Sequence, residues 1–150
     1  MKKIAFIALL VLMGITARGQ DALFKSFENV SGVSTVYISK SLLSMMPSLK
    51  VNNRDLAKMA GKLDHIQILS AEKANLVAKL KKQTASTYTA KNGYEEVMRA
   101  NESGQKVFIY QKRYKNGKHE FVLVTDALGH LSVVNILGTL TLKDIQSLTK

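Results

Sequence analysis

The residues of this chain that could do chemistry are few, and their spacing matches no known catalytic or metal-binding pattern. The histidines are His65, His119 and His130, cysteine is absent, and neither an HxH nor an HExxH spacing occurs. A zinc site needs three or four ligands that converge. The sequence also lacks a GxSxG nucleophile elbow and a glycine-rich phosphate loop. We therefore predict no catalytic residue, no metal ligand and no cofactor.

The acidic residues leave an enzymatic alternative open. Glu95 and Glu96 are neighbours, as are Asp64 and His65, and neighbours on a strand point to opposite faces of a sheet. A small hydrolase or glycan-active enzyme would need at least two of these four in one pocket, within about 5–10 Å, the range for paired glycosidase carboxylates. A third alternative, a carrier of an apolar ligand, would need a sizeable lined cavity.

A cluster of basic residues is the clearest candidate for binding. Four cations surround the turn Asn116-Gly117, namely Lys112, Arg113, Lys115 and Lys118. At the tip of a hairpin they could dock an anionic glycan or a lipid headgroup. The alternative is a solvated tip, because basic residues there also protect a sheet edge from unwanted pairing.

The overall charge of the chain also favours an anionic partner. Lysine and arginine number 22 against 11 acidic residues, a formal net charge of +11. Such a surplus attracts anionic surfaces or acidic proteins, although the lysines can also be simply solvated.

The first nineteen residues predict export. Lys2 and Lys3 precede an uncharged apolar run, 4–13, and Ala17 and Gly19 are the small residues expected before a signal-peptide cut. The run is shorter than the roughly 20 apolar residues that span a bilayer. We predict a cleaved signal peptide at 1–19 and a periplasmic or extracellular chain, soluble after cleavage, for which nucleic acid is not an expected partner.

Residues 20–150 suit a single α+β domain. We expect a mostly antiparallel (mixed) sheet with a C-terminal β-meander, packed by helices. No second apolar stretch is long enough to span a membrane. Helices are expected at 21–28, 41–46, 54–60, 71–84 and 139–149, with caps at Asn53, Ser70 and Thr141 and a left-handed Gly61; strands are expected at 33–39, 63–69, 94–100 (helix as the alternative), 107–115, 118–126 and 131–138.

Turn chemistry sets the expected register of the meander. Asn116-Gly117 is a strong two-residue hairpin signal and would place Arg113 opposite Glu120. Ala127, Leu128 and Gly129 suit a three-residue loop. One face would then carry Val107, Ile109, Val122, Val124, Val134 and Ile136, and the other Phe108, Tyr110, Phe121, Leu123, Val133 and Leu137.

Both of these faces are too apolar to be left in water. We expect the N-terminal helix or the long helix to cover the second face. Otherwise Phe108, Tyr110, Phe121 and Leu123 form a partner face, because large apolar patches mark interaction sites.

Four segments resemble a known family. They are Val36–Lys40, Leu43–Met46, Tyr94-Glu95 and Gly138–Ile145. In order and spacing they resemble the domain of unknown function 4252 family, small exported proteins of Bacteroidetes-type bacteria. The resemblance implies an exported α+β domain associated with envelope-stress or sigma/anti-sigma regulation. It supplies no catalytic residues. Many relatives are lipid-anchored. This chain has no cysteine to carry a lipid, so it departs from that pattern.

Together these observations favour a non-enzymatic, exported binding or accessory domain of the cell envelope. Its expected partner is an envelope protein or an anionic surface, with a link to envelope signalling. The oligomeric state is left open by the sequence.

Overall fold

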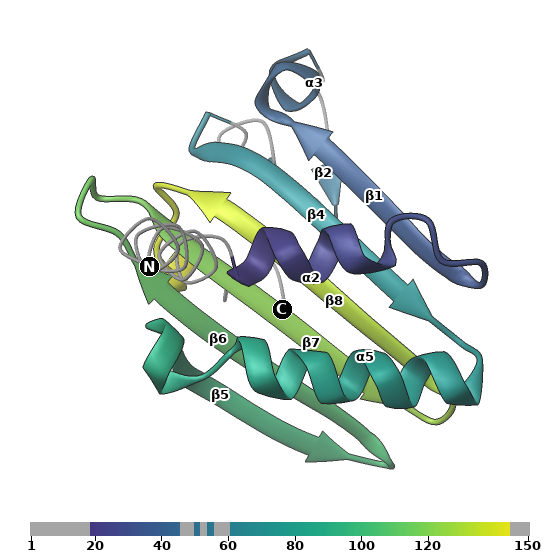
Figure 1. Ribbon diagram of the computed structural model, residues 1–150. Coiled ribbons are helices and arrows are strands. Elements are labelled where there is room, and N and C mark those ends of the chain that lie inside the picture. Colours follow the sequence, from purple (N-terminus) through teal and green to yellow (C-terminus); the bar gives the residue numbers. More distant parts are fainter. Residues whose placement is uncertain (1–18, 46–49, 52–53, 56–60, 145–150) are drawn as a thin grey trace, which may run out of the picture.

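Six strands form one antiparallel sheet in the computed structural model, which describes residues 19–45, 50–51, 54–55 and 61–144 (Figure 1). The strand order is β1-β4-β8-β7-β6-β5. This is the predicted α+β fold. The strands are β1 (Val33–Ser39), β4 (Leu63–Ala71), β5 (Glu95–Glu102), β6 (Gln105–Arg113), β7 (His119–Ala127) and β8 (His130–Gly138), and a separate short pair is β2 (Lys50–Val51) with β3 (Arg54–Asp55).

Two helices lie on the same face of the sheet, which we call the helix face (Figure 1). They are α2 (Gly19–Phe27) and α5 (Ala74–Thr87). Leu23, Phe24 and Phe27 of α2 are buried, as predicted from their spacing, and meet Leu76 and Leu80 of α5. Burying such a side chain contributes about 1.5–3 kcal/mol. From the strands, the same core takes Leu69, Ala71, Val122, Val124, Leu131 and Val133, with Phe108 and Tyr110 packed against it.

The opposite face of the sheet is covered at one end by other elements. Leu43 of α3 (Lys40–Ser44) and Leu140, which follows β8, pack with Leu63, Phe121 and Ile136. We call this side the second face. The expectation that α2 or α5 would cover the face with Phe108, Tyr110 and Val133 is confirmed, because these three pack with both helices. It is wrong for Phe121 and Leu123 of β7, which lie on the second face.

The first hairpin of the meander has a longer turn than predicted. Tyr114 N donates to Lys118 O at 2.9 Å, and Gly117 N donates to Tyr114 O at 3.2 Å. Residues 115–117 thus form a three-residue loop with Gly117 at φ 81°. Arg113 therefore faces His119, and Glu120 faces Lys112.

The second hairpin has a shorter turn than predicted. Ala127 pairs with His130 across a two-residue turn. The first turn is one residue longer than predicted and the second is one residue shorter. A one-residue slip moves every side chain of a strand to the other face of the sheet. Relative to the prediction, β7 is therefore inverted, whereas β8 keeps its expected faces. Val122 and Val124 point to the helix face, whereas Phe121 and Leu123 point to the second face.

Three local predictions are also corrected. Arg54 and Asp55 lie in β3 rather than in a helix, and Gly61 is not among the glycines with positive φ. Ser70 lies within β4, and α5 begins after Lys73, which makes no side-chain cap bond. The predictions for 1–18, 46–49, 52–53, 56–60 and 145–150, including most of the expected signal peptide, fall outside the described residues.

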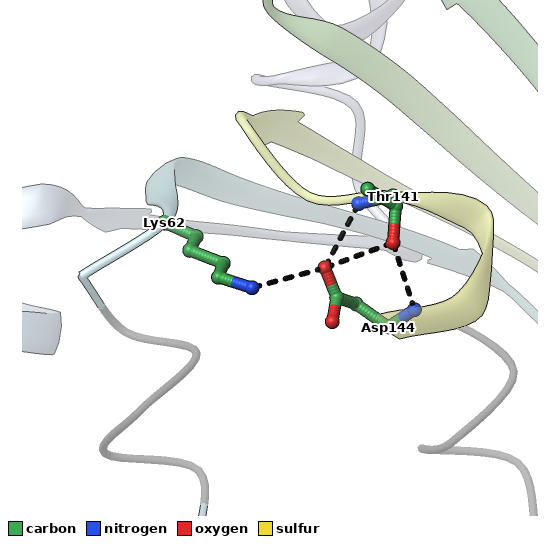
Figure 2. A network of polar contacts seen from close by, with 3 residues as sticks. All are labelled: Lys62, Thr141 and Asp144. Atoms are coloured by element: carbon green, nitrogen blue, oxygen red, sulfur yellow. Dashed lines mark hydrogen bonds and ion pairs between the residues drawn. The ribbon is translucent and has the colours of Figure 1, made fainter.

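The end of β8 is held by a close backbone contact and by a helix cap, which Figure 2 shows. Thr139 N donates to Lys62 O at 2.8 Å. Thr141 N donates to Asp144 Oδ2 at 2.9 Å, and Asp144 N donates to Thr141 Oγ1 at 3.3 Å. This reciprocal pair is a capping box, and it confirms Thr141 as the cap. Lys62 Nζ adds an ion pair to Asp144 at 3.4 Å.

Gly138 has no room for a side chain. A Cβ at this position would lie 2.0 Å from Lys62 O, a backbone atom. We expect Gly138→Ala to lower the free energy of unfolding by about 1–3 kcal/mol or more, because β8 and β4 must move apart. Urea unfolding followed by circular dichroism measures this. Gly61→Ala is the matched control, since a methyl group there would have no atom within 4 Å. Equal effects of the two substitutions would contradict the explanation.

Candidate functional site

The four residues of the enzymatic alternative do not come together. Asp64 and His65 are in β4, and Glu95 and Glu96 are at the start of β5. Three strands separate β4 from β5, a distance of roughly 19 Å at about 4.8 Å per strand. Asp64 is paired with Lys118 Nζ, and Glu96 forms two bonds with Arg99, at 2.7 and 2.9 Å.

The predicted partner face is divided between the two sides of the sheet. Phe108 and Tyr110 point to the helix face, and Phe121 and Leu123 point to the second face. Phe121 is fully buried within the chain. The four residues therefore do not form one apolar surface, and the cause is the inverted β7.

The predicted anion-binding tip is also divided. Lys118 pairs with Asp64, and Lys112 Nζ lies 5.3 Å from the ring centres of both Tyr94 and Tyr114. Arg113 and Lys115 are exposed. Two of the four cations are thus engaged with other side chains, which reduces the charge that the tip can present to an anion.

A buried carboxylate is the structural centre of this end of the sheet. Glu120 is 0% exposed. Tyr114 Oη donates to Glu120 Oε1 at 2.7 Å, and Tyr94 Oη donates to Oε2. Hydrogen bonds to an ionised group are about twice as strong as neutral ones, so these two donors offset much of the cost of burying the charge. Sequence analysis missed this role because the wrong register placed Glu120 beside Arg113.

A row of aromatic rings leads away from this carboxylate along the helix face. Tyr88 meets Tyr94 edge-on at 5.0 Å and stacks on Tyr110 at 5.7 Å, and Phe108 follows at 6.4 Å. Arg99 lies over Phe108, 5.6 Å from its centre. We call Tyr94, Tyr88, Tyr110 and Phe108 the aromatic row. Burial, together with the charge of Glu120, raises the pKa of Tyr88 and of Tyr94 above the ordinary value of 10.0. Both phenols therefore stay neutral, and the cluster supports the fold.

The outer surface of α5 is strongly basic. Between Glu72 and Glu95 the chain has no acidic residue, and every lysine in that interval is exposed. These are Lys73, Lys79, Lys81, Lys82 and Lys91. Lys81 pairs with Asp126 at 3.0 Å. Lys79, Lys81 and Lys82 are in α5, whereas Lys73 precedes this helix and Lys91 lies in the short 3-10 helix that follows it. Lys79 Nζ lies 5.9 Å from the centre of the Phe27 ring of α2. We call these five lysines the α5 basic surface.

The two edges of the sheet differ in kind. β5 carries four charged residues, and its pairing shifts between Glu96 and Met98, as at a bulge. β1 has neither charge nor proline, and its seven residues pair with β4 without interruption. Charges and bulges protect edge strands from further pairing. Of these two edge strands, only β5 has charged residues and a bulge.

An open groove lies beside β1. It has a volume of about 340 Å³ and is lined by Phe24, Lys25, Glu28, Thr35, Val36, Tyr37 and Gln67. Val36 and Tyr37 remain 44% and 60% exposed. The groove lies between the C-terminal end of α2 and β1, so a side chain from a segment added at β1 could reach it.

Comparison with known families identifies the chain. The family model for the domain of unknown function 4252 (DUF4252) matches residues 27–148. The chain belongs to this family. The matched region includes β1, α5, the meander and the Gly138–Asp144 segment, so both the open edge and the α5 basic surface lie inside it.

Other comparisons add little. No curated protein matches the sequence. One solved structure, a Pseudomonas aeruginosa protein of unknown function described as a candidate regulator, shares 8% identity and covers 77% of this chain and 72% of its own. Its TM-score is 0.33, so this likeness supports no inference about fold or function.

The bonds to Glu120 generate a test of stability. Tyr114→Phe leaves one oxygen of a buried carboxylate without this donor, and we expect a loss of about 1–3 kcal/mol in the free energy of unfolding. Tyr37→Phe, at a largely exposed ring, is the control and should change stability by less than about 0.5 kcal/mol. Urea denaturation of both variants decides the matter. A Tyr114→Phe protein as stable as the control would show that this bond contributes nothing.

The raised pKa of Tyr94 predicts an alkaline loss of stability. Above pH 10 the unfolded tyrosine ionises while the folded one keeps its proton, so the unfolded state gains relative stability as the pH rises. Tyr94→Phe should reduce this slope by up to about 1.4 kcal/mol per pH unit. Denaturation curves between about pH 9 and pH 11 measure it. An unchanged slope in Tyr94→Phe would argue against the assignment.

Proposed function

We propose that this chain is an exported, non-enzymatic binding domain of the cell envelope that docks on anionic membrane lipids through the α5 basic surface. The observation that carries the proposal is the charge of α5. All five lysines between Glu72 and Glu95 are exposed, and no acidic residue interrupts them.

The geometry of α5 suits a flat anionic partner. The helix lies along the sheet (Figure 1). Its buried residues are Leu76, Leu80 and Thr84. Lys79 and Lys82 are three residues apart and so share one side of the helix. Because the apolar stripe of α5 is used inside the core, binding rests on charge and not on insertion into the bilayer.

The expected affinity of one copy is low. A basic residue close to an anionic leaflet contributes about 1 kcal/mol. Lys81 is paired with Asp126, so the other four lysines would give on the order of 4 kcal/mol, a dissociation constant of about 1 mM. Salt weakens such binding, because the Debye length falls as ionic strength rises.

The leader supports an envelope location, and the described helices bear only on how a membrane would be contacted. The first nineteen residues have the pattern of a signal peptide, which would carry the domain out of the cytoplasm. Among the described helices, none has the length and apolar character needed to cross a bilayer. Contact with a membrane through these helices would therefore be at its surface.

Sedimentation with lipid vesicles tests the proposal. The chain without its leader (residues 20–150) should bind vesicles that contain about 30% phosphatidylglycerol and not pure phosphatidylcholine vesicles, and Lys79→Glu/Lys82→Glu should reduce the bound fraction at least about fivefold. Arg113→Glu/Lys115→Glu is the matched control, with the same change of charge at the hairpin tip.

The two double variants separate the two basic surfaces. If the tip variant loses binding and the α5 variant keeps it, the hairpin is the anionic site and the α5 proposal is wrong. Binding that is absent from vesicles but present on anionic polysaccharide would likewise overturn the lipid as the partner.

A further inference from the structure

We propose that two copies of this chain pair through β1, antiparallel and symmetric about Val36, so that two six-stranded sheets become one continuous sheet. This goes beyond the proposed membrane function and does not depend on it. The starting point is the difference between the edges: β1 is uncharged and regular, whereas β5 is charged and interrupted at Val97.

The register follows from the geometry of antiparallel strands. Residues directly opposite each other share a face of the sheet, so the two-fold axis must pass through a residue and not between two. Centring on Val36 uses all seven residues of β1. Thr35 then lies opposite the second copy's Tyr37, and Val36 lies opposite its own equivalent.

The groove beside β1 supports this register. Thr35 and Tyr37 both line it, and Tyr37 is 60% exposed. In the paired state, the Tyr37 ring of each copy would lie over Thr35 of the other, at the open groove of about 340 Å³. The interface is therefore self-complementary, as a two-fold contact requires.

Charge also favours a second copy at this edge. The chain has a net charge of +11, so two copies repel each other over most of their surfaces. β1 is the edge strand without a charged residue, so pairing there brings no like charges directly opposite each other. Because salt screens the remaining repulsion, the dimer should strengthen as ionic strength rises, whereas vesicle binding should weaken.

The paired arrangement has a geometric result. A two-fold axis perpendicular to the sheet leaves both helix faces on the same side. Two α5 basic surfaces would then face one membrane together, and linked sites of this kind raise apparent affinity by about 10²–10⁴-fold.

A single introduced cysteine gives a direct test, because the chain has none of its own. In Val36→Cys, the two thiols of a pair would lie opposite each other, with Cα atoms about 4.5–5.5 Å apart, within disulfide range. Mild oxidation of the purified full chain should convert most of it to a covalent dimer on non-reducing gels. Met98→Cys, in the other edge strand and equally exposed at 42% against 44%, is the matched control and should stay monomeric.

Two charged variants at Val36 test the pairing without relying on a cross-link. Val36→Lys places two like charges at the two-fold axis and should yield a monomer by light scattering, near 16.6 kDa for the full chain. Mixing Val36→Lys with Val36→Glu should restore the dimer. Circular dichroism checks that each variant is folded.

The inference is overturned if Val36→Cys fails to cross-link, if Met98→Cys cross-links as well, or if wild type is monomeric at all salt concentrations. If β1 instead binds an extended segment of another protein, the wild type would be monomeric at all salt concentrations. Since α5 is untouched by these variants, loss of the dimer leaves the single-copy vesicle binding of the proposed function intact, and the two ideas fail separately.

Discussion

The position of the meander depends on one buried charge. Glu120 is fully buried on the helix face, where Tyr94 and Tyr114 donate to its two oxygens. A one-residue slip of β7 would move Glu120 to the second face and force Phe121 to the other side. An ionised group that loses its hydrogen bonds in the interior costs several kcal/mol, so these tyrosines make the slipped register unfavourable. The aromatic row and its contact with α5 follow from that choice.

The distribution of charge then divides the molecule into surfaces of different chemical character. α5 is anchored to the sheet by Leu76 and Leu80, and its lysines face outward. β1 has no charge, and β5 has several. Neither property follows from composition, because the net charge of +11 does not say which elements carry it. The fold sorts it.

Much of the fold was accessible from the sequence. The apolar spacing of Leu23, Phe24 and Phe27 predicted the buried stripe of α2, β-branched runs predicted the strands, and Thr141 with Asp144 formed the expected cap. What failed was turn length. Asn116-Gly117 is a strong two-residue signal, yet the chain uses Lys115 as well, with Gly117 in the left-handed position. A three-residue loop with glycine at that position is also a common hairpin connection, so the turn residues alone do not decide the length.

The candidate surfaces were less accessible than the fold. The tip lysines were correctly found as a cluster in the sequence, but Lys112 lies over aromatic rings and Lys118 binds Asp64 from a distant strand. Likewise, Phe108 and Phe121 are both apolar strand residues, and only the register decides that they lie on opposite faces. Local patterns identify residue types well. They do not identify which long-range partner each residue meets.

The bulge at Val97 in β5 has a consequence for how far assembly can go. A sheet with two open edges can add copies without limit and grow into a filament. Here one edge has a shift in register and carries Glu95, Glu96, Arg99 and Glu102, so the pairing proposed at β1 would be complete after a single partner. An irregular, charged edge strand of this kind would then keep a dimer from growing into a filament.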